Sequence, residues 1–172
     1  VAQVEVDEQQ VNLTRFSLLF PEKRDFFLEG RGLYEFGRVS DLSPGDAPRL
    51  FFSRQIGLSR GRVVPILAGA RLTGKVGDTA FGALNLQTDD ETASGTPRTN
   101  FTILRVKRDI LRRSNVGAMF TGRSASTTAP GHANQAYGVD GVFSFYDNLA
   151  FGGFYARTDT PGLGRSEEHT SE

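Results

Sequence analysis

The 172-residue chain contains no cysteine and no tryptophan, and only two histidines. The absence of cysteine excludes disulfide bonds, zinc–thiolate sites and cysteine nucleophiles. The scarcity of histidine removes the side chain most used for metal binding and for acid–base catalysis near neutral pH. Neither sign of charge is in excess, because 20 Lys and Arg face 20 Asp and Glu. We therefore expect no metal, no cofactor and no nucleic-acid partner.

The chain also lacks the roughly 18 consecutive apolar residues of a transmembrane helix. Membrane-spanning β-strands need no such run, because only every second residue has to be apolar. The composition, with 20 glycines and 14 phenylalanines, instead indicates β-structure in which backbones approach closely.

From about residue 63 the sequence predicts an all-β fold, an antiparallel up-and-down meander of about six strands. The two-residue loops Gly77–Asp78 and Asp147–Asn148 are typical of tight hairpins, and five residues, 111–115, join the third strand to the fourth. The other connections are longer, so short and long joints alternate as in an outer-membrane barrel. The predicted strands are 64–76, 79–89, 99–110, 116–124, 137–146 and 149–158.

Apolar and polar residues alternate along these strands, which predicts one apolar and one charged face. Leu84 and Leu86 in the second strand, for example, fall on the apolar face opposite Asn85 and Gln87. In a soluble sandwich the apolar face would form the core, whereas in a membrane barrel it contacts lipid and the charged face lines the lumen. The candidate lumen-facing binding residues are Arg71, Lys75, Arg105, Lys107, Asp109 and Asp140.

Three features favour the membrane barrel over the sandwich. The strands are longer than the five or six residues typical of globular sheets. The apolar face is rich in glycine and alanine, and aromatic residues fall near strand ends, where they would form girdles in contact with lipid. These aromatic residues are Phe81, Phe101, Phe120, Tyr137, Tyr146 and Tyr155.

Two features predict that the chain is a fragment. Six strands do not close a transmembrane barrel, for which eight is the smallest number, so we expect further strands elsewhere. Residues 165–172, RSEEHTSE, resemble the translation of a common sequencing adapter, so we expect the native part of this sequence to be cut off after Gly164 and further strands to follow in the full protein. We assign residues 1–62 to a linker, lumen or plug-like segment, 63–160 to the first barrel strands and 161–172 to a loop and tail.

The densest motif in the first 62 residues is 20–30, FPEKRDFFLEG. Its carboxylates Glu22, Asp25 and Glu29, at i, i+3 and i+7, would share one face of a helix and are the candidate catalytic residues. A glycan hydrolase that uses two carboxylates is therefore one alternative function. In the structural interpretation, Pro21 opens a short helix, Gly30 ends it and the phenylalanines wedge the segment into the barrel.

Four stretches carry a family resemblance: 11–30, 50–57, 65–76 and 100–110. Together they resemble the bacterial family DUF5916, a domain of unknown function. The resemblance implies an outer-membrane barrel in contact with lipid, preceded by a carbohydrate-binding family-9-like sandwich that is absent from this sequence. It also implies surface-glycan binding or transport through that module, and it supplies no catalytic residues. A soluble β-sandwich binding module is the remaining alternative.

Overall fold

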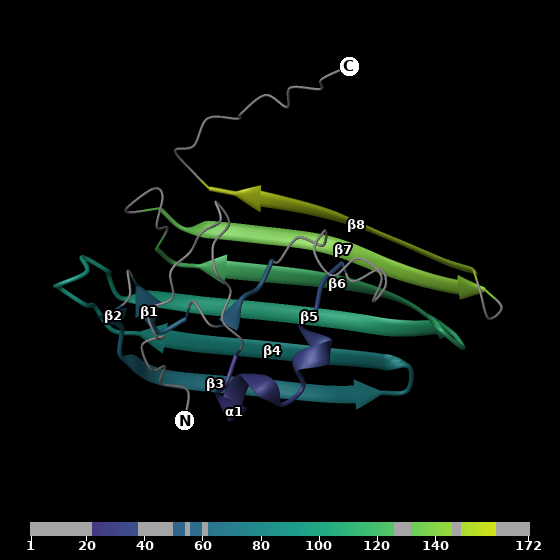
Figure 1. Cartoon of the computed structure of the whole chain (residues 1–172), viewed down its shortest axis with the longest axis horizontal. Coiled ribbons are helices and arrows are strands. Elements are labelled where there is room, and N and C mark those ends of the chain that lie inside the picture. The colour runs from purple at the N-terminus through teal and green to yellow at the C-terminus, as the bar shows by residue number, and fades with distance from the viewer. Residues whose placement is uncertain are drawn as a thin grey trace, which may run out of the picture.

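The structure, a computed structural model, describes residues 22–37, 50–53, 56–59, 62–125, 132–145 and 149–160. Its main element is one six-stranded antiparallel sheet in which each strand pairs with the next along the chain (Figure 1). This confirms the predicted all-β meander, and the sheet is open, with β3 and β8 at its edges. The strands are β3 (Ile66–Val76), β4 (Thr79–Thr88), β5 (Thr99–Leu111), β6 (Ser114–Arg123), β7 (Asn134–Phe145) and β8 (Leu149–Asp159).

Tight turns connect the strands at one end of the sheet. Gly77 has φ 56° in the predicted two-residue loop, a backbone conformation that favours glycine. The prediction of a five-residue connection between β5 and β6 is wrong, because Leu111 pairs with Ser114 and leaves only two residues in the turn. The longer connection 89–98 lies at the opposite end of the sheet, where β6 also ends and β7 begins.

Strand register defines two faces. The inner face carries the row Arg71, Leu84, Ile103, Thr121 and Ala136, whose members pair across successive strands. The outer face carries the adjacent row, shifted by one residue: Leu72, Ala83, Leu104, Phe120 and Tyr137.

The predicted side of Leu84 and Leu86 is wrong. Both lie on the inner face with Arg71, while Asn85 and Gln87 lie on the outer face. The reason is the strand register. The two-residue loop sets Val76 opposite Thr79, and counting five residues away from the loop along each strand places Arg71 opposite Leu84.

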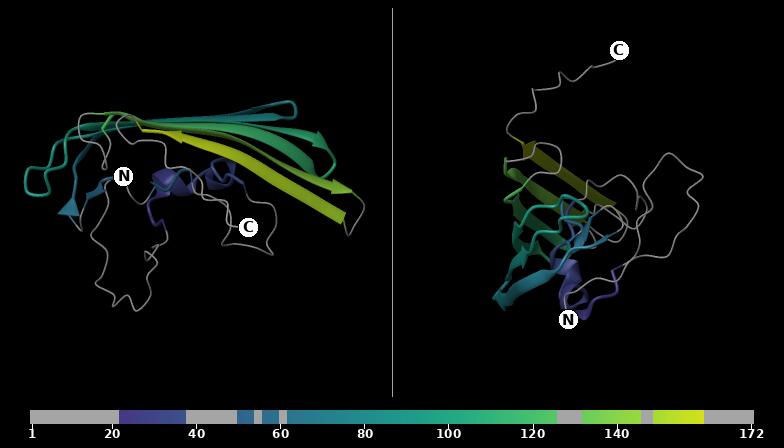
Figure 2. Two further views of the ribbon diagram at one scale, coloured as in Figure 1. Left: turned by 90° about the horizontal axis from the view of Figure 1, so that it is seen from above. Right: turned by 90° about the vertical axis from the view of Figure 1, so that its left-hand side faces the viewer.

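Residues 22–37, here called the belt, cover part of the inner face (Figure 2). The belt contains the one-turn helix α1 (Asp25–Leu28) and the 3-10 turn η1 (Arg31–Leu33), and a small hairpin of β1 (Leu58–Ser59) and β2 (Arg62–Val63) precedes the sheet. The main hydrophobic core lies between belt and sheet. Its buried members are Phe27, Tyr34, Phe36, Ile56, Leu84, Leu86, Ile103 and Met119.

Four of the predictions concern residues that the structure does not describe: the resemblance of 165–172 to an adapter, the position of Tyr146, the hairpin loop Asp147–Asn148 and the helix start at Pro21. Among the residues that it does describe, no helix has the length and hydropathy needed to span a membrane.

Candidate functional site

The inner face is built around a buried ion pair between two non-adjacent strands. Arg105 of β5 reaches across β6 to Asp140 of β7, with Nη1 2.5 Å from Oδ1 and Nη2 2.8 Å from Oδ2. Gly117 of β6 makes this possible, because a Cβ at that position would lie 2.8 Å from the guanidinium. The pair therefore ties together three strands and requires glycine in the middle one.

The same ion pair holds the belt. Arg105 donates to the carbonyl oxygens of Leu33 and Glu35, each at 3.1 Å, and Asp140 accepts a bond from the Gly37 backbone N–H at 3.1 Å. Only 2% of Arg105 is exposed to solvent. Because a buried charge must be fully paired and hydrogen-bonded, these contacts identify the pair as an anchor for the belt.

Arg71 makes a second contact with the belt, from β3. Its guanidinium donates to the carbonyl oxygens of Phe26 at 2.6 Å and Glu29 at 2.9 Å, and it pairs with the Glu29 carboxylate. Arg71 also lies over the Phe26 ring, 5.5 Å from its centroid. The belt thus runs from β3 at one edge of the sheet to β7 near the other, fixed at both ends by charge-assisted hydrogen bonds.

A third arginine lies within the belt itself. Arg24 pairs with Glu22 at 2.7 Å and donates to the carbonyl oxygens of Ser53 at 2.7 Å and Ile56 at 2.9 Å. The Ser53 hydroxyl donates to Glu22 at 2.6 Å, and the Phe27 ring centroid lies 4.2 Å from the Arg24 guanidinium. This network joins the belt to residues 53–56. Arg24 and Ser53 were not predicted as site residues, because no spacing pattern in the sequence marks them.

The predicted helix face of three carboxylates is wrong. α1 contains only four residues, so Glu22 precedes it and Glu29 follows it in an extended conformation. Gly30, with φ 72°, ends the turn immediately. Glu22 and Glu29 each pair with a different arginine, and Asp25 is exposed. Within the described ranges, no three His, Asp or Glu side chains are grouped as a metal site requires.

The six residues predicted to face a lumen all lie on the inner face, but in two environments. Arg71, Arg105 and Asp140 contact the belt. Lys75 and Asp109 form an exposed pair at 3.2 Å near the tight turns, and Lys107 lies on the same face. Surface pairs of this kind contribute little to stability. Both side chains of the Lys75–Asp109 pair are accessible to solvent or solute, whereas Lys107 is half-buried.

Glycines on the inner face accommodate the belt's aromatic rings. A Cβ at Gly138 would lie 2.5 Å from the Phe36 ring, and a Cβ at Gly82 would lie 2.8 Å from both Leu33 and the Tyr34 hydroxyl. Gly82, Gly117 and Gly138 fall at inner-face positions of β4, β6 and β7, a pattern that can be recognised in the sequence only once the strand register is known.

The predicted girdle is wrong for one aromatic residue. Phe101 pairs with Leu86 and packs against the core on the inner face. Phe81, Phe120, Tyr137 and Tyr155 lie on the outer face.

Acid should weaken the network around Glu22. Burial alone raises the pKa of Glu22, but hydrogen bonds from Arg24 and Ser53 outweigh it and lower that pKa from 4.5 to about 2. Because the folded-state pKa is depressed, its contribution to stability is fully present above pH 4.5 and is lost as pH falls through about 2. We expect the difference in unfolding free energy between wild type and Glu22→Gln to shrink over that range in urea titrations. A difference that does not change with pH would contradict this assignment.

A family model described as "Domain of unknown function (DUF5916)" matches residues 1–66. No curated protein and no solved structure matches the chain at a significant level. The matched region contains the belt and the hairpin β1–β2, which are the segments that precede the sheet. This match, over residues 1–66, supports the resemblance to the DUF5916 family.

Proposed function

We propose that this chain forms part of the wall of an outer-membrane β-barrel, with the inner face toward the lumen and the belt lying across it as a plug-like segment. The observation that carries the proposal is the exposure of large apolar side chains on the face opposite the belt. The covered face holds the buried Arg105–Asp140 pair, while the opposite face exposes large apolar side chains. A soluble sheet buries its apolar face, whereas a barrel wall in lipid exposes it.

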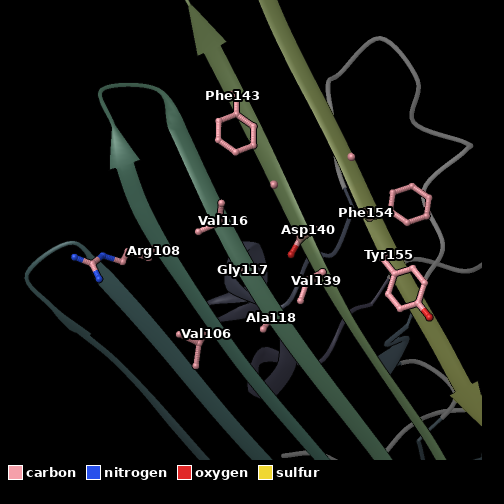
Figure 3. A pocket seen from close by; sticks show the side chains of 12 residues that line it. Val106, Arg108, Val116, Gly117, Ala118, Val139, Asp140, Phe143, Phe154 and Tyr155 are labelled. Atoms are coloured by element: carbon pink, nitrogen blue, oxygen red, sulfur yellow. The ribbon is translucent and has the colours of Figure 1, made fainter.

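Over β5 to β8, the part of the outer face nearer the tight turns is mainly apolar. Figure 3 shows Val106, Val116, Val139, Phe143 and Tyr155 around a shallow hollow on this face. Leu72, Val76 and Tyr155 are 63%, 72% and 62% exposed, values expected for side chains that meet acyl chains rather than water. Arg108 also lies here, three residues before the end of β5, where its long side chain can extend to the membrane surface.

Strand length and connections fit the same proposal. The six strands contain 10 to 13 residues, compared with the roughly 9–11 that cross a bilayer at a tilt. Tight turns lie at one end and longer connections at the other, as at the periplasmic and external rims of a barrel. In lipid, the open edges at β3 and β8 would leave backbone groups unpaired at a cost of several kcal/mol each, so we expect both to pair with further strands.

The belt determines which charged residues would line a passage through the proposed lumen. Arg71, Arg105 and Asp140 hold the belt, so any passage along this wall would run past Lys75, Lys107 and Asp109 instead. A role in surface-glycan binding or transport comes from the family resemblance, and no contact in this sheet favours the hydrolase alternative.

The proposal predicts heat-modifiable mobility. We expect the full-length protein, extracted from outer membranes and kept unheated in dodecyl sulfate, to migrate differently from a boiled sample, because closed barrels resist the detergent. A protein recovered in the soluble fraction, with the same mobility before and after boiling, would contradict the barrel and favour a soluble sandwich.

A further inference from the structure

The outer face of the β4–β5 hairpin changes polarity in steps along its length. Nearest the tight turns, the cross-strand pairs are apolar, then amide and hydroxyl side chains replace them, and an ion pair follows where the long connection begins. In register order these pairs are Phe81–Val106, Ala83–Leu104, Asn85–Thr102 and Gln87–Asn100, followed by the Asp89–Arg98 ion pair at 3.0 Å.

The polar side chains in the middle form a connected group, here called the amide ladder: Asn85, Gln87, Asn100 and Thr102. Asn85 Nδ2 donates to Asn100 Oδ1 at 2.9 Å and to Thr102 Oγ1 at 2.8 Å, and Asn100 Nδ2 donates to Gln87 Oε1 at 3.2 Å. The ladder has no net charge and offers both donors and acceptors.

Other strands become polar at the same end of the outer face. Gln135 and Arg157 are exposed there on β7 and β8, beyond Tyr137 and Tyr155. Exposed amides and guanidinium groups are unfavourable in hydrocarbon, where no water completes their hydrogen bonds, and favourable in a hydrated headgroup layer.

We propose that the change from apolar pairs to the amide ladder marks the edge of the hydrocarbon core of the outer leaflet. Ala83 and Leu104 contact acyl chains, and the amide ladder binds the hydroxyl and carbonyl groups of neutral headgroup moieties. The long connection 89–98, with its Asp89–Arg98 pair, then lies in water outside the cell. This inference rests on the proposed function. It adds the depth at which these residues lie in the membrane and the lipid groups that they contact.

The chain's lack of cysteine makes a direct test possible. Single variants Val106→Cys, Ala83→Cys and Gln87→Cys would be prepared in the full-length protein, reconstituted into phospholipid vesicles and treated with a membrane-impermeant maleimide. All three thiols lie on the outer face of one hairpin, so they differ mainly in depth. We expect Gln87→Cys to react at least ~10-fold faster than the other two, and all three to react equally after unfolding in dodecyl sulfate.

The outcomes separate the two proposals. If Val106→Cys and Ala83→Cys are protected and Gln87→Cys is also protected, the barrel wall stands and the boundary at the amide ladder is wrong. If Ala83→Cys reacts as fast as Gln87→Cys while Val106→Cys is protected, the boundary lies deeper and the inference is again overturned. Rapid labelling of Val106→Cys would overturn the lipid-facing wall itself.

Discussion

Replacing Arg105 with methionine is expected to lower the free energy of unfolding by about 3–5 kcal/mol, because it leaves a buried carboxylate without its counter-ion. Among the residues that the structure describes, Asp140 would keep only the bond from the Gly37 N–H, and the carbonyls of Leu33 and Glu35 would lose the bond from Arg105. Methionine retains much of the apolar volume, so the change tests charge and hydrogen bonding. Equilibrium urea titration, in the detergent or lipid in which the protein is folded, would measure the loss.

Lys75→Met is the matched control for Arg105→Met. It also removes a cation from an ion pair on the inner face, but Lys75 and Asp109 are both well exposed, at 60% and 51% of their side chains. We expect a loss below about 1 kcal/mol. Equal losses for the two variants would show that burial of the Arg105–Asp140 pair has no special role in holding the belt.

Gly138→Ala is expected to destabilise the protein by about 1–3 kcal/mol through overpacking. The added Cβ would lie 2.5 Å from the Phe36 ring and 2.7 Å from the Tyr155 carbonyl oxygen. The ring can shift, but the carbonyl belongs to the backbone of the adjacent strand β8 and cannot move without disturbing strand pairing.

Gly153→Ala is the control for Gly138→Ala, because no described atom outside Gly153 and its two chain neighbours lies within 4 Å of its ideal Cβ position on β8. We expect its unfolding free energy to stay within about 1 kcal/mol of wild type, since alanine is at least as favourable as glycine in a strand. Urea titration of both variants, with limited proteolysis to detect release of the belt, would check this. Unchanged stability in Gly138→Ala would show that Phe36 does not pack tightly on the sheet.

The strands of the meander were predictable because alternation and turn chemistry are local properties of a sequence. Gly77–Asp78 marks one hairpin directly. Alternation within one strand does not show which of its two faces matches a given face of the neighbouring strand. To place Leu84 and Leu86 on the inner face, the residue pairing has to be counted from the Gly77–Asp78 loop along both strands. The turn between β5 and β6 was missed because Leu111 and Ser114 pair past a register shift.

The belt contacts were not predictable in the same way. The alternation of side chains along β5 and β7 could place Arg105 and Asp140 on one face. Nothing in the sequence indicates that Arg105 also binds the carbonyls of Leu33 and Glu35. Glu22 and Glu29 suggested a helix face because their spacing fits one. The structure ends the helix after four residues and directs these two carboxylates to Arg24 and Arg71 instead.

The belt has a consequence for the order of folding. Each strand of the sheet pairs with its neighbour in sequence, so the hairpins close short loops. The bonds from Arg105 to Leu33 and from Gly37 to Asp140 instead join residues 72 and 103 positions apart. Because long loops close slowly and gain contacts only when both partners are in place, we expect belt docking to be the late kinetic step, completed only after β7 has joined the sheet.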